Sequence, residues 1–229
     1  MRYYITDKKK GKVLNRLSLA VLTGFLVFYI SLWHTFLQNP RKRSSIFSCG
    51  NTDLDDFFNK EALIYKESLM GKTYCFIKKQ YDNVNQNSDH TFTIVAAFTV
   101  SNDSLKISDL PNNRKKKMTD KTHKHLKRYP GVLIGRLGVN KDFCGKGIGS
   151  AVLNYVKDWF SEPENKTGCR YVIVDALNSE KVLKFYLNNE FKFLFSSEKQ
   201  EAEYENKESK DTEIPKTRLM YYDLLGLST

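Results

Sequence analysis

The alternation of apolar and polar residues predicts one helix and two strands in the first half of the chain. Residues 51–69 place apolar side chains on one helical face, and Thr52 with Asp55 has capping-box spacing at the start of that helix. Two apolar runs, 73–79 and 91–101, have the length and composition of strands. The polar stretch between these runs predicts a hairpin loop.

The second half of the chain alternates between strand and helix patterns. Apolar residues at i, i+3, i+4, i+7 and i+8 from Val152 predict an amphipathic helix, and 171–177 is typical of a strand buried on both faces. The charged stretch 198–216 is expected to be a solvated connection. This order indicates an α/β or α+β domain with a mixed sheet. The other expected elements are strands at 131–139, 191–197 and 217–225 and a helix at 179–189.

Residues 17–39 form an unusual segment near the N-terminus. They carry no formal charge, and basic residues flank them on both sides. A transmembrane helix needs roughly 20 mostly apolar residues, so a membrane anchor is one interpretation. The others are a buried strand and helix at the start of the globular domain, and an extension outside the working protein. We expect an N-terminal segment at 1–45 and a globular domain at 46–229.

The chain has a net charge of +11, and two segments hold most of the excess. Residues 1–43 contain nine Lys and Arg against one acid, and residues 114–128 contain eight against one. The second segment could neutralise several phosphates of a nucleic acid, and a solvated loop is the alternative. Its basic residues are Arg114, Lys115, Lys116, Lys117, Lys121, Lys124, Lys127 and Arg128.

The cysteines and histidines argue against metal chemistry. Cys49, Cys75, Cys144 and Cys169 stand far apart with no Cys-x-x-Cys pair, and the four histidines form no cluster with acids at ligand spacing. We therefore expect four reduced thiols, with neither a metal site nor a disulfide framework.

Three glycines alternate between the expected strand 131–139 and the helix that follows it. Gly145, Gly147 and Gly149 let backbone N–H groups of the first helical turn converge on one point, and they let an anion approach without meeting a Cβ. Lys146 adds a positive charge. The spacing matches neither the nucleotide P-loop nor the dinucleotide fingerprint, so the stretch predicts a phosphate site or a structural turn.

Residues 131–193 contain, in order, the stretches "VLIGRLGV", "CGKGIG", "YVIVDALN" and "KVLKFYLNNEF". They resemble the core of the GNAT acetyltransferase superfamily. The resemblance implies a mixed, mainly antiparallel sheet flanked by helices, a central β-α-β core that binds acetyl-CoA, and direct acetyl transfer to a primary amine. Cys144 stands where Arg or Gln is usual, and "NNEF" replaces the usual x-x-Gly-Phe. The resemblance assigns to acetyl-CoA the backbone of Leu137 and Val139, together with Cys144, Gly145, Lys146, Gly147, Ile148, Gly149, Ser150 and Asn178.

Tyr186 is the residue expected to act in catalysis. In related enzymes a tyrosine of the matching "FY" pair lies near the thioester sulfur and protonates the departing thiolate, and a phenol with a pKa of about 10 suits that role. A core aromatic is the alternative, because Phe185 and Tyr186 also fit the apolar stripe of their helix. Cys144 is not the expected nucleophile, since family members usually transfer the acyl group directly and no histidine is placed by sequence to activate it.

Residues 47–58, "FSCGNTDLDDFF", resemble the opening of a GNAT branch that includes toxins of toxin–antitoxin pairs. Those enzymes acetylate the amino group of aminoacyl-tRNA, so the resemblance implies tRNA as acceptor, with an antitoxin and a homodimer as further partners. The alternatives are a GNAT enzyme acting on a small amine or a protein N-terminus, and an inactive acyl-CoA-binding or membrane-tethered module. No acidic residue stands out as general base. Because acetyl-CoA is a cytosolic metabolite, we expect a cytoplasmic catalytic domain, with or without an anchor at 17–39.

Overall fold

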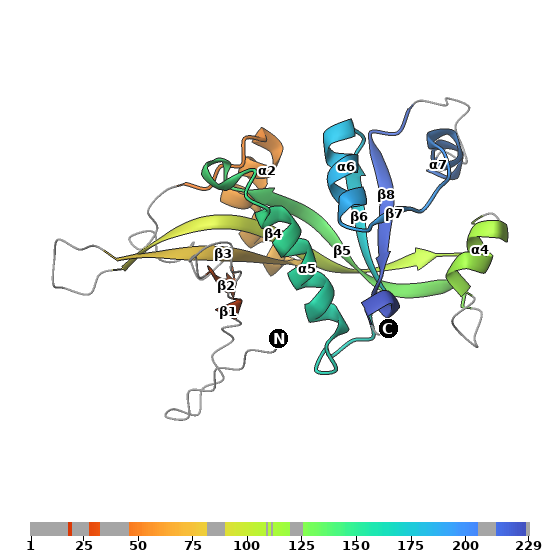
Figure 1. The fold of residues 1–229 in the computed structure, drawn as a ribbon, viewed down its shortest axis with the longest axis horizontal. Coiled ribbons are helices and arrows are strands. Elements are labelled where there is room, and N and C mark those ends of the chain that lie inside the picture. Colours follow the sequence, from red (N-terminus) through yellow and green to blue (C-terminus); the bar gives the residue numbers. More distant parts are fainter. Residues whose placement is uncertain are drawn as a thin grey trace. The chain divides into compact units, whose positions relative to one another are not determined.

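The computed structural model describes residues 18–19, 28–32, 46–81, 90–108, 110, 112–119, 126–205 and 214–227, and Figure 1 shows the elements in chain order. The strands are β1 (Ser18–Leu19), β2 (Phe28–Leu32), β3 (Lys72–Tyr81), β4 (His90–Lys106), β5 (Arg128–Val139), β6 (Tyr171–Leu177), β7 (Lys192–Phe193) and β8 (Thr217–Asp223). The α-helices are α2 (Thr52–Asp56), α3 (Ala62–Glu67), α4 (Asn112–Thr119), α5 (Ile148–Ser161), α6 (Glu180–Asn188) and α7 (Glu198–Glu205). Single turns are the π-helical η2 (Phe57–Glu61) and the 3-10 helices η3 (Lys141–Phe143) and η4 (Leu224–Leu227).

The strands follow the order β1-β2-β3-β4-β5-β6-β8-β7. Strand β5 pairs parallel with β6, and β6 pairs antiparallel with β8. The pairs β1–β2, β2–β3, β3–β4 and β7–β8 are also antiparallel. The expected α/β class with a mixed, mainly antiparallel sheet and helices is therefore confirmed.

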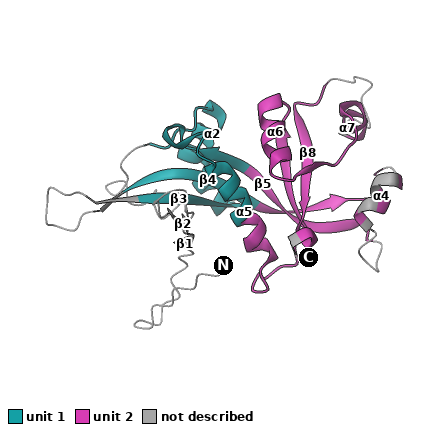
Figure 2. Ribbon diagram, in the orientation of Figure 1, with its two compact units in different colours: residues 1–100, 136–155 teal, residues 101–135, 156–229 magenta. Residues whose placement is uncertain are grey.

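The chain divides into two compact units, which Figure 2 shows in different colours. Unit 1 comprises residues 1–100 and 136–155, and unit 2 comprises residues 101–135 and 156–229. Strands β4 and β5 and helix α5 each contribute residues to both units.

The strands of unit 1 bury side chains on both faces, in keeping with the two-residue period of a strand. The helical segment 52–67 packs against one face. Phe58 is fully buried there, and the rings of Phe47 and Phe57 meet it edge-on at centroid distances of 5.3 and 5.5 Å. The apolar helical face predicted from the sequence is thus the buried one. The same cluster contains Ala62, Cys75, Ile77, Ile94 and Ala97.

Helix α5 packs against side chains of alternate strand residues in unit 1. The ring of Tyr155 lies edge-on to Phe76 at 5.5 Å and to Phe98 at 6.5 Å. Phe76 stands between two residues of the first cluster, so its side chain projects from the other face. Each edge-to-face pair contributes about 0.5–1.5 kcal/mol beyond its buried area, and together they fix the first turns of α5 on the sheet.

The first helix begins with a different cap from the one that the sequence predicted. The capping residue is Asn51 rather than Thr52, and its side-chain oxygen accepts a hydrogen bond from the third backbone N–H of the helix at 3.1 Å. Asp55 instead accepts from the Ser48 hydroxyl at 2.8 Å and from the Cys49 N–H at 2.7 Å. Burial alone would raise the pKa of this carboxyl, but the hydrogen bonds outweigh burial and lower it. The segment that precedes α2 is therefore held to this helix by two hydrogen bonds.

Unit 2 is built around β6. Residues 131–133 of β5 pair with residues 171–173 of β6, and β8 pairs with β6 along its whole length. Four successive residues from Tyr171 are buried. The predicted buried strand at 171–177 is therefore confirmed with the same bounds.

Helix α4 overlaps the start of the basic segment 114–128, for which the sequence predicted no helix. Met118 is the one apolar residue of this helix, and it is buried in a cluster with Leu105, Ile107 and Tyr129. Its carbonyl oxygen accepts a hydrogen bond from the Tyr171 hydroxyl at 3.3 Å. A single buried side chain therefore anchors a helix of otherwise polar residues, which periodicity cannot detect.

Helix α7 corrects the first part of the expected solvated connection at 198–216, of which residues 206–213 lie outside the described part of the chain. Glu201 is fully buried, and its carboxylate accepts hydrogen bonds of 2.5 Å from Arg218 Nε and from the Leu219 N–H. The Arg218 guanidinium also lies 4.6 Å from the centre of the Phe193 ring. Burial of the Glu201 carboxylate is tolerable only because Arg218 pairs with it. The pattern of apolar residues did not predict this helix, because Arg218 is distant from it in the chain.

Part of the apolar segment 17–39 forms β2, which pairs antiparallel with β3 from Phe28 opposite Lys78 to Leu32 opposite Tyr74. In the portions of the chain that the structure describes, no helix is both long enough and apolar enough to cross a membrane. Strand β2 agrees with the strand part of the second interpretation, a buried strand and helix at the start of the domain. Ser18–Leu19 of the segment form β1, which pairs with β2, and its other residues lie outside the described part of the chain.

Candidate functional site

Asn140 fixes the point in unit 1 where β5 ends and the glycine stretch begins. Its side chain is buried, Nδ2 donates to the Ile94 carbonyl at 3.0 Å, and its backbone N–H donates to the Val95 carbonyl at 2.8 Å. The register of β4 against β3 skips one residue at Val95. Asn140 Oδ1 also accepts from the Asp142 N–H at 3.1 Å. A β-bulge and one amide thus set the direction of the following turn.

Gly145 and Gly147 adopt a backbone conformation that favours glycine. Their φ angles are 74° and 73°, in the left-handed region that costs other residues roughly 1 kcal/mol. A Cβ placed at either residue would meet no heavy atom within 4 Å. Glycine is therefore required by φ and not by crowding, and the backbone of the turn is exposed.

Helix α5 begins at Ile148, directly after the turn. Ile148 is buried, Gly149 and Ser150 are half-buried, and the Ala151 N–H donates to the Gly147 carbonyl at 3.0 Å. The first N–H groups of a helix have no intrahelical acceptor, and the helix dipole adds partial positive charge. This arrangement can bind an anion through the backbone.

Two exposed side chains stand within the turn. Lys146 Nζ donates to the Asp142 carbonyl at 3.0 Å and lies 5.3 Å from the centre of the Phe143 ring. The Cys144 thiol lies back against β5, with its sulfur 3.6 Å from the Val139 carbonyl oxygen. Lys146 therefore keeps a cation beside the turn, whereas Cys144 supplies only a weak donor.

The predicted backbone contacts of β5 flank a tightly packed glycine. A Cβ on Gly138 would lie 3.2 Å from the Phe58 ring and 3.3 Å from the Phe47 ring. By strand alternation, the half-buried Leu137 and Val139 project to the opposite face. The aromatic residues at the start of the domain therefore pack directly against Gly138 and hold this stretch of β5 in place.

Tyr186 lies on α6 in unit 2 and is 9% exposed. Its ring meets Phe185 at 5.1 Å and Phe191 at 5.4 Å, both edge-on. Burial raises the pKa of the phenol to about 12. The residue therefore packs as a core aromatic, and its hydroxyl keeps its proton at neutral pH.

Lys157 is a buried cation of unit 2 that the sequence did not single out. Its side chain is 3% exposed, and Nζ donates to the Asn189 carbonyl at 2.9 Å and lies 3.7 Å from the Glu190 carboxylate. The ammonium also lies 4.0 Å from the centre of the Tyr222 ring. Burial lowers the pKa of Lys157, and the Glu190 carboxylate opposes that effect. Lys157 lies beside the apolar stripe of α5 and not within it, so the helical pattern of the sequence did not mark it.

Glu190 occupies the position where the family pattern has glycine, and its φ is 66°. We expect Glu190→Gly to be more stable than Glu190→Ala by about 1 kcal/mol, because both remove the carboxylate but only glycine relieves the backbone. Denaturant unfolding of the two variants measures the difference. Equal unfolding free energies would show that no strain is stored at this residue.

Asn178 lies just after β6 and is held by two other segments of unit 2. Its side-chain Nδ2 donates to Glu198 at 3.1 Å and to the Pro215 carbonyl at 2.9 Å, and its backbone N–H donates to the Lys216 carbonyl at 2.9 Å. Glu198 in turn lies 3.5 Å from Arg218. Helix α7 thus orients this amide, and the predicted contact of Asn178 with the acyl donor stays a prediction.

The basic run 114–128 divides between a helix and a strand of unit 2. Arg114–Lys117 lie on α4, where Lys116 is exposed, and Lys127 and Arg128 are exposed around the start of β5. Five of the eight basic residues, Arg114–Lys117 and Arg128, therefore lie on a helix or a strand, and Lys127 lies in the bend before β5. Lys121 and Lys124 lie outside the described residues.

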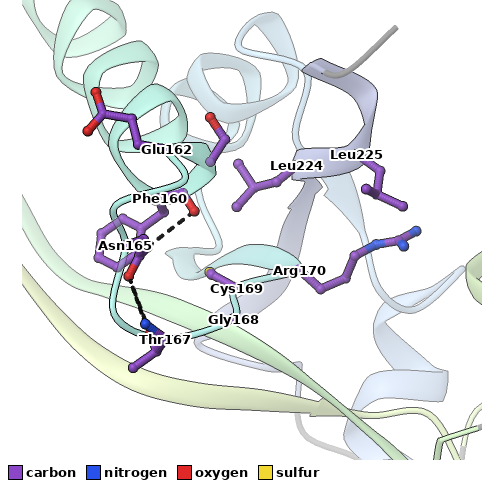
Figure 3. A pocket seen from close by; sticks show the side chains of 10 residues that line it. Phe160, Glu162, Asn165, Thr167, Gly168, Cys169, Arg170, Leu224 and Leu225 are labelled. Atoms are coloured by element: carbon purple, nitrogen blue, oxygen red, sulfur yellow. Dashed lines mark hydrogen bonds between the residues drawn. The ribbon is translucent and has the colours of Figure 1, made fainter.

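A separate hollow of about 270 Å³ lies beside the end of α5 and the start of β6 in unit 2 (Figure 3). Asn165 closes the end of α5 by donating to the Phe160 carbonyl at 3.2 Å and accepting from the Thr167 N–H at 3.2 Å. Arg170 has an ion-pair partner on β8, and burial raises the pKa of the Cys169 thiol to about 11. None of the residues that line this hollow was predicted from the sequence to take part in binding or catalysis.

The predicted residues fall into two groups. Leu137, Val139 and the turn 144–150 come together in unit 1, whereas Tyr186, Asn178 and the basic run belong to unit 2. Among the described residues, no three His, Cys, Asp or Glu side chains are grouped to hold a metal ion.

Comparison with known proteins finds a tRNA-acetylating toxin of Mycobacterium tuberculosis that is 26% identical over 145 residues. The match covers 63% of this chain and 75% of the toxin. No protein-family model matches. The resemblance to the GNAT branch that includes tRNA-acetylating toxins, inferred above from sequence, is thus confirmed.

Solved structures of toxins share the fold. A tyrosine-to-phenylalanine variant of KacT has a TM-score of 0.61 at 18% identity, covering 88% of this chain and 97% of KacT. AtaT complexed with acetyl-methionyl-tRNAfMet has a TM-score of 0.55 at 16% identity, and the match covers 80% of this chain and 88% of the AtaT chain. An AtaT variant bound to acetyl-CoA and the C-terminus of the antitoxin AtaR has a TM-score of 0.52 at 15% identity, covering 80% and 86%.

Proposed function

We propose that this chain is an acetyltransferase that moves the acetyl group of acetyl-CoA to the amino group of aminoacyl-tRNA. The observation that carries the proposal is the exposed glycine turn at the start of α5, with Gly145 and Gly147 in the left-handed region. The curated relative is a tRNA-acetylating toxin, and an AtaT structure of the same fold contains acetyl-methionyl-tRNA.

The donor end of the site uses backbone groups. The first N–H groups of α5 bind the pyrophosphate of acetyl-CoA, and Lys146 contributes a cation next to them. The backbone of Leu137 and Val139 holds the thioester carbonyl and the pantetheine. Cys144 in place of Arg or Gln removes one side-chain contact and leaves the backbone donors in place.

Tyr186 assists the departure of the thiol. The attacking amine forms a bond to the acetyl carbon, the carbon–sulfur bond breaks, and the phenol donates to the sulfur as negative charge develops there. The nitrogen loses one proton as the amide forms, and this proton passes through solvent to the departing sulfur, so the products are the amide and the thiol of coenzyme A. An α-amino group, with a pKa of about 7.7, has a far larger unprotonated fraction near neutrality than a lysine side chain, with a pKa of about 10.4, and it therefore needs less help from a base.

The acceptor end is proposed to include the basic residues of α4 and β5 in unit 2. Charges on folded elements contact phosphates with less loss of conformational entropy than charges on a free loop. A cognate antitoxin belongs to the proposal as well, because structures of AtaT include complexes with its antitoxin AtaR.

Neutralising Lys115 and Lys116 together should weaken tRNA binding and flatten its dependence on salt. Each phosphate contact contributes about 0.7–0.9 to the slope of log affinity against log salt, so we expect the double Lys→Gln variant to lose about 1.5. Filter binding at several salt concentrations gives the slope. Lys199→Gln on the acidic helix α7 is the matched control, and an unchanged slope in the α4 variant would remove α4 from the tRNA site.

The function itself is tested with labelled acetyl-CoA and charged tRNA. We expect label in the aminoacyl ester, and no label on uncharged tRNA or on tRNA whose amino group is already acetylated. Labelling of a small polyamine or a peptide N-terminus, with none on charged tRNA, would replace the proposed acceptor. Binding of coenzyme A without transfer to any amine would contradict the enzyme proposal.

A further inference from the structure

Lys157 is placed where a lysine is costly and where an apolar residue would pack as well. Its side chain is 3% exposed, and taking an ammonium from water is unfavourable unless several partners receive it. The partners are a carbonyl oxygen at 2.9 Å, a carboxylate at 3.7 Å and the face of the Tyr222 ring at 4.0 Å. A buried ammonium is rarely needed for stability, so the contacts of Lys157 indicate another role.

The contacts of Lys157 converge on the C-terminal end of α6. The last carbonyl groups of a helix have no intrahelical donor and form the negative end of its dipole, so a cation there is favourable. The Asn189 carbonyl, which accepts from Lys157, belongs to the capping residue of α6. The ammonium thus satisfies and neutralises the end of this helix from within the core.

The same short segment holds Tyr186. The backbone N–H groups of Asn189 and Phe191 both donate to the Tyr186 carbonyl, at 3.0 and 3.1 Å. The Phe191 ring packs on the Tyr186 ring at 5.4 Å, and Lys157 Nζ lies 5.6 Å from the centre of the Phe191 ring. A shift of residues 189–191 therefore moves the backbone and the ring of Tyr186 together.

We infer that Lys157 is a positioning residue for Tyr186: its ammonium fixes the last turn of α6, and this turn holds the phenol in one orientation. The inference rests on the proposed function only for the step in which that phenol assists the leaving thiol. Glu190 is a lesser partner, because its carboxylate is 75% exposed and lies farther from Nζ than the carbonyl does.

The test compares Lys157→Met, which keeps the volume but removes the donor, with Lys157→Gln, which can still donate to the Asn189 carbonyl. We expect kcat to fall about tenfold in the Met variant and about threefold in the Gln variant, with KM for acetyl-CoA within about twofold of wild type. Lys184→Met replaces an exposed lysine on α6, the helix that carries Tyr186, and as the matched control it should leave kcat unchanged.

A double-mutant cycle separates positioning from general destabilisation. If Lys157 acts through the Tyr186 hydroxyl, Lys157→Gln should have almost no further effect on kcat once Tyr186 is phenylalanine. Additive losses in the double variant, or Lys157 variants that fold and keep the wild-type kcat, would overturn the inference. Should Lys157→Met fail to fold, the Gln variant carries the same comparison.

A readout without catalysis keeps this test distinct from the proposed function. Amide hydrogen exchange of Asn189 and Phe191 should be faster in Lys157→Gln, and the ring resonance of ¹³C-labelled Tyr186, assigned with Tyr186→Phe, should shift or broaden. If these signals change while no acetyl transfer to charged tRNA is found, the positioning stands and the proposed function fails. Unchanged signals would exclude the positioning whatever the activity is.

Discussion

Tyr186→Phe is expected to lower kcat for acetyl transfer by about 100-fold, with KM for acetyl-CoA changed by less than about twofold. The substitution removes one hydroxyl and keeps the ring, so the edge-on contacts with Phe185 and Phe191 survive. A hydroxyl that acts only as charge develops on sulfur contributes to kcat and not to donor binding. Initial rates with labelled acetyl-CoA and charged tRNA measure the effect.

The control for this substitution is Tyr204→Phe. Tyr204 lies in unit 2 on α7, half-buried against Phe195 with ring centroids 4.8 Å apart, and the sequence assigns it no chemistry. We expect its rate to match wild type. A Tyr186→Phe enzyme that also keeps the wild-type kcat would leave Tyr186 as a core aromatic only.

The raised pKa of Tyr186 determines how far the phenol can transfer its proton to the leaving thiolate, and the pH at which the phenol ionises. A thiol has a pKa of about 8.5, so full proton transfer from a phenol of pKa about 12 to the thiolate is uphill, and a strong hydrogen bond to sulfur is the expected role. Because the folded phenol keeps its proton above the ordinary tyrosine value of about 10, its ionisation should cause no loss of rate below that pH. The same pKa difference between the folded and unfolded chain makes the free energy of unfolding depend on pH. The contribution of Tyr186 is complete below about pH 10 and is lost as the pH rises through about 12.

The sequence predicted the elements whose signals are local. The turn at Gly145 and Gly147 was readable because a left-handed φ favours glycine, and α5 was readable because its apolar residues repeat at helical spacing. Helices α4 and α7 were not readable. Their anchors include Met118 of α4 and Glu201 of α7, whose burial depends on partners supplied by other segments.

The site followed the same division. The residues of the turn lie together because they are contiguous in the chain, and their contact with the donor stays a prediction. Asn140 was missed because its hydrogen bonds reach the bulge of β4. Lys157 was missed because only packing reveals that its ammonium faces the end of α6. Long-range hydrogen bonds to backbone carbonyls leave no periodic trace in a sequence.

Gly147→Ala is expected to raise KM for acetyl-CoA by at least about tenfold with a smaller change in kcat, since one charge-assisted hydrogen bond is worth about 1.5–3 kcal/mol. The wild-type φ of 73° disfavours alanine, and relaxing it turns the N–H groups away from the anion. The new methyl would also project into space that is open in the free protein. Coenzyme A binding by calorimetry and KM from initial rates measure the loss.

Two further variants separate these causes. Gly168→Ala places a methyl in open space at an ordinary φ and should bind coenzyme A like the wild type. Gly147→Asn keeps a side chain but tolerates the left-handed region better than alanine. If asparagine restores binding, backbone conformation is the cause; if asparagine and alanine lose it equally, the Cβ blocks the approach of the pyrophosphate. Wild-type binding in both variants would mean that the anion contacts the protein elsewhere, and the turn would then serve only to connect β5 to α5.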